Sequence, residues 1–222
     1  MIITGNSGTY AQVPAGSHVA VCFRVVDLGT QTETYEGNVS QKRKLLISWE
    51  IDEPNPSADN ERFTISKFYT ASLSPKSKLR PDLESWRGRV FTDEELKGFD
   101  IAKILGQGCM LSVAEGDNGG KSKVVGVMAL PKGMKAFAGS KDPVHFSFDN
   151  FDMDSFNELP EGIQKIIMDS AEWRKMNEKP VAQPPKASVE VKMVQQKNGA
   201  VKAVVVQPEE PAGDLLDDEI PF

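Results

Sequence analysis

Alternating apolar and polar positions in the first third of the chain predict β-strands. The segment 18–27 has the β-branched enrichment of a strand, alternation is clear at 44–51, and 62–73 is expected to form a third strand. Within the second segment Trp49 falls on the apolar side, so we expect it in the core. The dipeptide Leu28-Gly29 is expected to end the first strand, and the Pro- and Asn-rich stretch 53–60 is expected to be a loop.

Helical spacing replaces this alternation in the next segment. Residues 77–86 predict a helix that begins near Arg80, has Trp86 in the core and ends at Gly88. Thr92 with Glu95 three residues later has the pattern of a capping box, which predicts a second helical start. Two further strands are expected on either side of a Gly-rich hairpin, at 109–114 and 123–130.

The order of these elements predicts a mainly β fold with helical insertions. Five strands with a helical insert between the third and the fourth is the order of an OB-fold, a small Greek-key barrel that commonly binds oligonucleotides. Other small β-barrels with an insert would give the same order.

The C-terminal part predicts a peripheral helix followed by a tether. Residues 159–176 have an apolar stripe at helical spacing, and we expect this single helix to pack against the barrel. The sequence therefore predicts four regions: an irregular N-terminal arm at 1–17, an OB-like domain with the peripheral helix at 18–176, a linker with a weak hairpin around Asn198-Gly199 at 177–206, and an acidic tail at 207–222.

Composition and charge narrow the function classes. Two Cys and two His exclude a disulfide scaffold and a zinc finger, and the absence of a long apolar run or a secretory signal predicts a cytoplasmic protein. The net charge of −6 at first argues against a nucleic-acid partner. However, the whole acidic excess lies in 207–222, so the rest of the chain is neutral.

The last fifteen residues, PEEPAGDLLDDEIPF, carry the most specific motif in the sequence. Their ending resembles the acidic tip of bacterial single-stranded DNA-binding proteins (SSB), with a Glu where that tip has an Asp. The residues expected to bind a partner are Asp214, Asp217, Asp218, Glu219, Ile220, Pro221 and Phe222. A terminal Phe can fill an apolar pocket on a partner, and its carboxylate and the acids before it can pair with basic residues there.

The body of the chain does not resemble bacterial SSB. Its segments 14–31, 69–96 and 99–113 are similar to phage and prophage proteins that are often called single-stranded DNA-binding proteins. The resemblance implies sequence-independent binding of single-stranded DNA (ssDNA) in phage replication, recombination and repair, in the cytoplasm of the bacterial host. It also implies a tail that recruits replication or recombination proteins. No cofactor and no metal are expected, and a homodimer is left open.

Non-specific ssDNA binding requires cations for phosphates and flat side chains for stacking on bases. Of the adjacent Phe68 and Tyr69 only one can face outward in a regular strand, and we favour Tyr69 because its hydroxyl tolerates water. Arg87 and Arg89 could instead pair with Asp93 or Glu94. The candidate DNA-binding residues are Tyr35, Lys42, Arg43, Lys44, Lys67, Tyr69, Lys76, Lys78, Arg80, Arg87, Arg89, Lys121 and Lys123.

The sequence predicts that the protein is not an enzyme. It contains no phosphate loop of the Walker type and no arrangement typical of a catalytic triad. The aspartates at 149, 152 and 154 lack the ligand spacing of an EF-hand. Three alternatives remain: an adaptor or inhibitor that mimics the SSB tip to bind host repair proteins, a strand-annealing recombination protein, and a metal-dependent nuclease.

Overall fold

The computed structural model describes residues 11–59, 61–117, 120–177, 192–195 and 201–204. The chain divides into two units, 1–178 and 179–222. In the second unit β7 (Lys192–Gln195) pairs antiparallel with β8 (Val201–Val204), where the sequence predicted a hairpin. The acidic tail at 207–222 lies outside the described residues. Among the described residues, no helix is long and apolar enough to cross a membrane.

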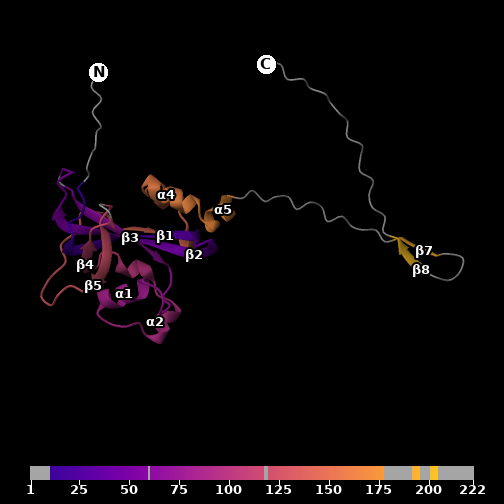
Figure 1. The fold of residues 1–222 in the computed structure, drawn as a ribbon, viewed down its shortest axis with the longest axis horizontal. Coiled ribbons are helices and arrows are strands. Elements are labelled where there is room, and N and C mark those ends of the chain that lie inside the picture. The colour runs from indigo at the N-terminus through magenta and orange to yellow at the C-terminus, as the bar shows by residue number, and fades with distance from the viewer. Residues whose placement is uncertain (1–10, 60, 118–119, 178–191, 196–200, 205–222) are drawn as a thin grey trace, which may run out of the picture. The chain divides into compact units, whose positions relative to one another are not determined.

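An antiparallel sheet with one short parallel strand forms the centre of the first unit (Figure 1). Its strands are β1 (Gly16–Tyr35), β2 (Asn38–Pro54), β3 (Arg62–Thr70), β4 (Gly108–Ala114), β5 (Lys123–Met128) and β6 (Val144–Phe146). Their order is β3-β2-β1-β4-β5, and β6 pairs parallel with β1. The prediction of a mainly β fold with helical insertions is therefore confirmed. The sheet is open between β3 and β5, and the alternation did not reveal β6.

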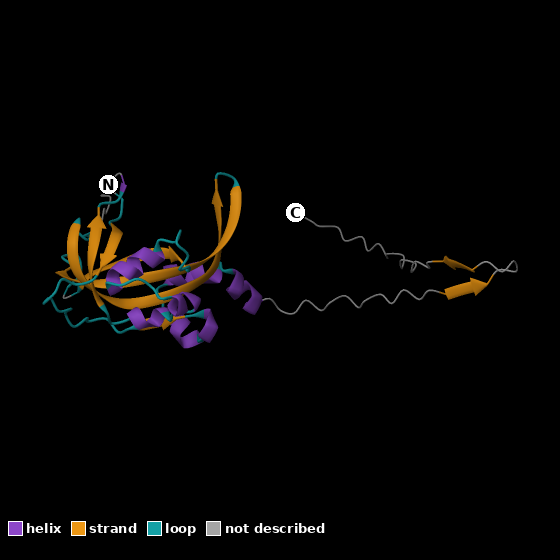
Figure 2. Cartoon of the chain, turned by 90° about the horizontal axis from the view of Figure 1, so that it is seen from below, coloured by secondary structure: helices purple, strands orange, loops and turns teal. Residues whose placement is uncertain are grey.

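The first strand extends well beyond its predicted end. The expected turn at Leu28-Gly29 is wrong, because β1 passes through an irregularity between Asp27 and Gly29 and continues to Tyr35. Gly29 has a φ of +69°, which suits a glycine at a bulge. The chain turns instead at Glu36 and Gly37, both with positive φ as a tight hairpin turn requires. Figure 2 shows this long hairpin extending beyond the helices. The arm predicted at 1–17 is also shorter, since β1 begins at Gly16.

Short helices lie on both sides of the sheet. In Figure 1, α1 and α2 lie on one side, and α4 and α5 lie on the other. The helical elements are α1 (Leu79–Arg87), α2 (Asp93–Lys97), η1 (Ile101–Ile104), η3 (Phe148–Asn150), α3 (Met153–Asn157), α4 (Glu161–Met168) and α5 (Ala171–Asn177). The α1 helix begins one residue before the predicted start and ends at Gly88, and Thr92 with Glu95 forms the predicted capping box.

Two buried apolar clusters hold the layers together. The larger cluster contains both Trp49 and Trp86, as predicted, and their ring centroids lie 6.1 Å apart. The smaller cluster packs Val26, Leu28 and Leu46 of the sheet against residues of β6 and of the helices α3 and α4. Burial of these apolar groups is the main stabilising contribution to such a fold.

The prediction of a single C-terminal helix at 159–176 is wrong. It is divided into α4 and α5 at Asp169-Ser170. Ser170 is fully buried, and its hydroxyl oxygen accepts a hydrogen bond from the Trp173 N–H at 3.1 Å, which caps the start of α5. The break turns α5 so that Glu172 reaches β1, where it accepts hydrogen bonds from the backbone N–H and the hydroxyl of Thr30 at 2.6 and 2.7 Å.

Gly29 lies in close contact with the segment that begins α5. A Cβ atom there would lie 2.6 Å from Ser170 Cβ and 2.8 Å from the Phe148 ring. We expect Gly29→Ala to lower the free energy of unfolding by about 2–4 kcal/mol, because it combines left-handed strain with overpacking. Denaturant unfolding followed by tryptophan fluorescence measures this.

Gly37 provides the matched control. Its φ is +78°, but a Cβ atom there would meet nothing within 4 Å. Gly37→Ala should therefore cost only about 1 kcal/mol, from backbone strain alone. Equal losses in the two variants would show that the contact between Gly29 and Ser170 does not limit the packing of α5.

Candidate nucleic-acid interface

Strand β3 lies at one end of the sheet path and presents a mixed outer face. It pairs with β2, and among the described residues no other strand pairs with it. Phe63, Ile65 and Tyr69 point into the core, so Phe68 must point outward, because successive side chains alternate across a strand. The Phe68 side chain is 58% exposed, which is unusual for a phenylalanine and leaves its ring available for stacking.

A groove beside Phe68 gathers four of the predicted cations. Its volume is about 620 Å³. Because a second cavity borders Phe68 from the other side, we call this first one the lysine half of the groove along β3. Lys42 and Lys44 contribute from β2, and Lys76 and Lys78 contribute from the segment between β3 and α1. The remaining lining residues are Phe68, Tyr69, Thr70, Ser72, Ser74 and Ser77. None of the residues that line the lysine half is acidic, so its field favours an anion.

The four lysines differ in their existing partners. Lys44 Nζ lies 2.5 Å from Glu33 and Lys42 Nζ lies 3.5 Å from it, and these contacts lower the pKa of the Glu33 carboxyl, with Lys44 the larger cause. Lys76 and Lys78 are exposed and form no ion pair with any described residue. These two side chains are therefore the cations most available to a phosphate.

A second cavity continues from Phe68 toward the other end of β3. Its volume is about 500 Å³, and we call it the apolar half. It is lined by Ala11, Gln12, Val13, Asn55, Phe63, Thr64, Ile65, Ser66, Phe68, Lys121 and Ser122. No acidic residue lines it, and Phe68 lines both halves. The two halves therefore meet at an exposed aromatic ring.

Hydrogen bonds between loops build the outer wall of the apolar half. The Ala11 N–H donates to Ser57 Oγ at 2.7 Å, and the Ser122 hydroxyl donates to the Val13 carbonyl at 2.6 Å. The N-terminal segment is thus connected both to the loop after β2 and to the loop before β5. This places Lys121, a predicted DNA-binding residue, at the edge of the cavity.

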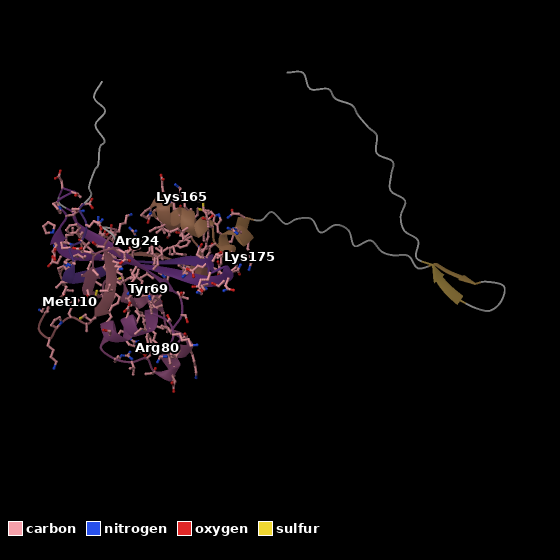
Figure 3. The ribbon with its side chains drawn as sticks, viewed as in Figure 1. Arg24, Tyr69, Arg80, Met110, Lys165 and Lys175 are labelled. Carbon is pink, nitrogen blue, oxygen red and sulfur yellow. The ribbon has the colours of Figure 1, made fainter. Side chains whose placement is uncertain are left out.

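The choice of Tyr69 as the exposed aromatic is wrong. Tyr69 is only 4% exposed, and its hydroxyl donates to Asp82 Oδ2 at 2.8 Å. Lys67 donates to the same oxygen at 2.7 Å, so this predicted cation supports α1 against β3. Burial and the neighbouring Asp82 raise the pKa of the Tyr69 hydroxyl. Figure 3 shows Tyr69 near the middle of the first unit.

Several other predicted cations are paired within the fold. Arg43 donates to Asp27 at 2.5 Å and to Asp149 at 3.1 Å, and Asp27 is the main cause that raises the pKa of its guanidinium. Arg80 pairs with Glu84 on α1 at 2.9 Å, and Lys123 pairs with Asp117 at 3.0 Å. These three residues do not line either half of the groove.

Arg87 and Arg89 pair with neither Asp93 nor Glu94. Both contact Glu95 instead, and the distance from Arg89 is 2.7 Å. Arg89 is the largest cause that lowers the pKa of the Glu95 carboxyl to about 2, and the Thr92 N–H and Arg87 add to it. The Arg87 guanidinium also lies over the Phe91 ring, 4.4 Å from its centroid. Both arginines line a different cavity, at the end of α1, and not the groove along β3.

The side chain of Tyr35 and the tail residues 207–222 lie outside the described part of the chain.

Sequence reasoning missed Phe68 and the polar residues of the apolar half. The signal for Phe68 was present: Thr64, Ser66 and Thr70 are polar at every second position, so Phe68 shares their outer face. Gln12 and Asn55 gave no such signal, because they meet only through the loop contacts described above.

Compared with known proteins, the chain matches no family model and no curated protein sequence.

Proposed function

We propose that this protein binds single-stranded DNA without strong sequence preference along the groove on β3. The observation that carries the proposal is a groove without lining acids, in which four lysines lie beside the exposed ring of Phe68. Lysines that follow the backbone and an aromatic ring that stacks on bases are the two elements such binding requires. In this function the protein would act in phage replication, recombination and repair, in the cytoplasm of the bacterial host.

The strand order supports the proposal. The path β3-β2-β1-β4-β5, with helices between β3 and β4, is the strand order of an OB barrel that is opened between its third and fifth strands. OB-folds bind oligonucleotides on the face of their second and third strands, between the loops 1–2 and 4–5. The groove uses the corresponding parts of this chain: β2, β3 and Lys121 in the loop before β5.

A fluorescence-anisotropy titration tests this function. Labelled oligo-dT should bind with an affinity that falls steeply with salt. Four phosphate contacts would give a slope of about −3 in log affinity against log salt concentration. A duplex of equal length should bind more weakly, because its bases are not free to stack on Phe68. Equal or tighter binding of the duplex would contradict the proposal, and no binding of oligo-dT would favour an adaptor instead.

We propose further that the SSB-like ending at Phe222 recruits replication or recombination proteins. Deleting residues 209–222 should leave ssDNA affinity intact or increased, because it removes six acidic residues. The same deletion should abolish binding to a purified bacterial enzyme that recognises SSB tips. Removing Phe222 alone provides the sharper variant, since it takes away the aromatic ring and leaves the acids. Unchanged enzyme binding in both variants would overturn the recruiting role.

A further inference from the structure

The apolar half of the groove presents amide donors on its wall. Asn55 Oδ1 accepts a hydrogen bond from the Ser57 N–H at 3.0 Å, and Gln12 Oε1 accepts one from the Ser122 N–H at 2.6 Å. A backbone N–H can only donate, so these bonds fix which atom of each amide is the oxygen. The NH₂ groups of Gln12 and Asn55 and the ammonium group of Lys121 have no partner among the described residues. The side-chain groups of Gln12, Asn55 and Lys121 that have no partner among the described residues are thus donors.

We propose that the apolar half binds a nucleobase and prefers one that carries carbonyl oxygens, thymine over adenine. The proposal rests on the ssDNA-binding function proposed above. Thymine presents its O2 and O4 oxygens as acceptors, and both can receive bonds from such a wall. Adenine carries a donor amino group where thymine has the acceptor O4, and this amino group cannot pair with the NH₂ groups of Gln12 and Asn55 or with the ammonium group of Lys121. With adenine in the cavity some of these donors would stay unpaired, and this favours thymine.

The placement of the cavity suits a base whose phosphates lie in the lysine half. Phe68 lines both halves, so a strand that stacks on this ring has its backbone near Lys76 and Lys78 on one side. On the other side the cavity is backed by Val13, Phe63 and Ile65, whose side chains are almost fully buried. The volume of about 500 Å³ lies within the range of small-molecule sites.

The test compares oligo-dT and oligo-dA of equal length in the same anisotropy assay. The wild-type protein should bind oligo-dT about three- to tenfold more tightly, as one or two hydrogen bonds would give. Because oligo-dA also stacks on itself, the ratio of the two affinities is compared between variants. Asn55→Asp keeps the oxygen that holds Ser57 but replaces the donor with an acceptor, so the ratio should fall toward one. Gln12→Glu makes the same change beside Ser122 and serves if the first variant does not fold.

Ser74→Asp is the matched control, since it adds the same negative charge to the lysine half. It should weaken both oligonucleotides equally and keep the wild-type ratio. A wild-type ratio near one, or equal ratios in the Asn55→Asp, Gln12→Glu and Ser74→Asp proteins, would overturn the base preference and leave the ssDNA function standing. Failure of the wild-type protein to bind either oligonucleotide would instead contradict the proposed function.

Discussion

Reversing the charge of Lys76 and Lys78 should abolish most of the ssDNA affinity. We expect the double variant Lys76→Glu/Lys78→Glu to bind oligo-dT on the order of 100-fold more weakly at ~50 mM salt. These side chains are exposed and pair with no described acid, so the change removes two phosphate contacts and breaks no ion pair of the described fold. The neutral variant Lys76→Ala/Lys78→Ala should reduce the magnitude of the salt slope by about 1.4, because each single-strand phosphate contact contributes about 0.7.

The control for this prediction is a second pair of exposed lysines. Lys165 on α4 and Lys175 on α5 line neither half of the groove, and Figure 3 shows them on the helices above the sheet. Lys165→Glu/Lys175→Glu changes the net charge by the same amount. An equal loss of affinity in this variant would mean that overall charge governs binding and would contradict the groove.

Replacing Phe68 by Ala should weaken ssDNA binding strongly while leaving the fold intact. Stacking on an aromatic side chain contributes about 1–3 kcal/mol per base, which corresponds to roughly a 5- to 150-fold loss in affinity. Because the ring is more than half exposed, the midpoint of thermal unfolding should change little. Phe68→Trp should restore affinity, and its fluorescence should be quenched on addition of oligo-dT.

Val39 provides the comparison for Phe68. It is 67% exposed on β2, near the turn of the β1–β2 hairpin, and lines neither half of the groove. Val39→Ala should leave ssDNA affinity unchanged. If Phe68→Ala bound oligo-dT as tightly as Val39→Ala, the exposed ring would not be a stacking platform and the position of the interface would be wrong.

The core tryptophans and several helix ends could be predicted from the sequence, because the signals for them are local. Alternation placed Trp49 in the core, helical spacing placed Trp86 there, and Gly88 with the Thr92–Glu95 capping box marked helix ends. The break at Ser170 could not be predicted, since the apolar stripe runs on through it. Ser170 is packed against Gly29, 141 positions earlier, and no local pattern in the sequence indicates this contact.

The candidate site was predicted only in part, for a different physical reason. Lys42, Lys44, Lys76 and Lys78 line one groove, and their role in binding DNA stays a prediction. Which of the predicted cations stay free of an ion pair depends on residues far away in the sequence. Arg43 is paired because the register of β1 and β2 and the segment after β6 bring Asp27 and Asp149 to it. Arg80 with Glu84 four residues later is the one such pair that the sequence alone indicates.

Photochemical cross-linking tests the position of the interface most directly. The full-length protein is bound to oligo-dT containing 5-iodouracil and irradiated, and the cross-linked peptides are identified by mass spectrometry. We expect the main adduct on the β3 peptide that contains Phe68, with further adducts in the segment of Lys76 and Lys78. Adducts confined to the peptides of α4 and α5, with β3 unmodified, would contradict the account.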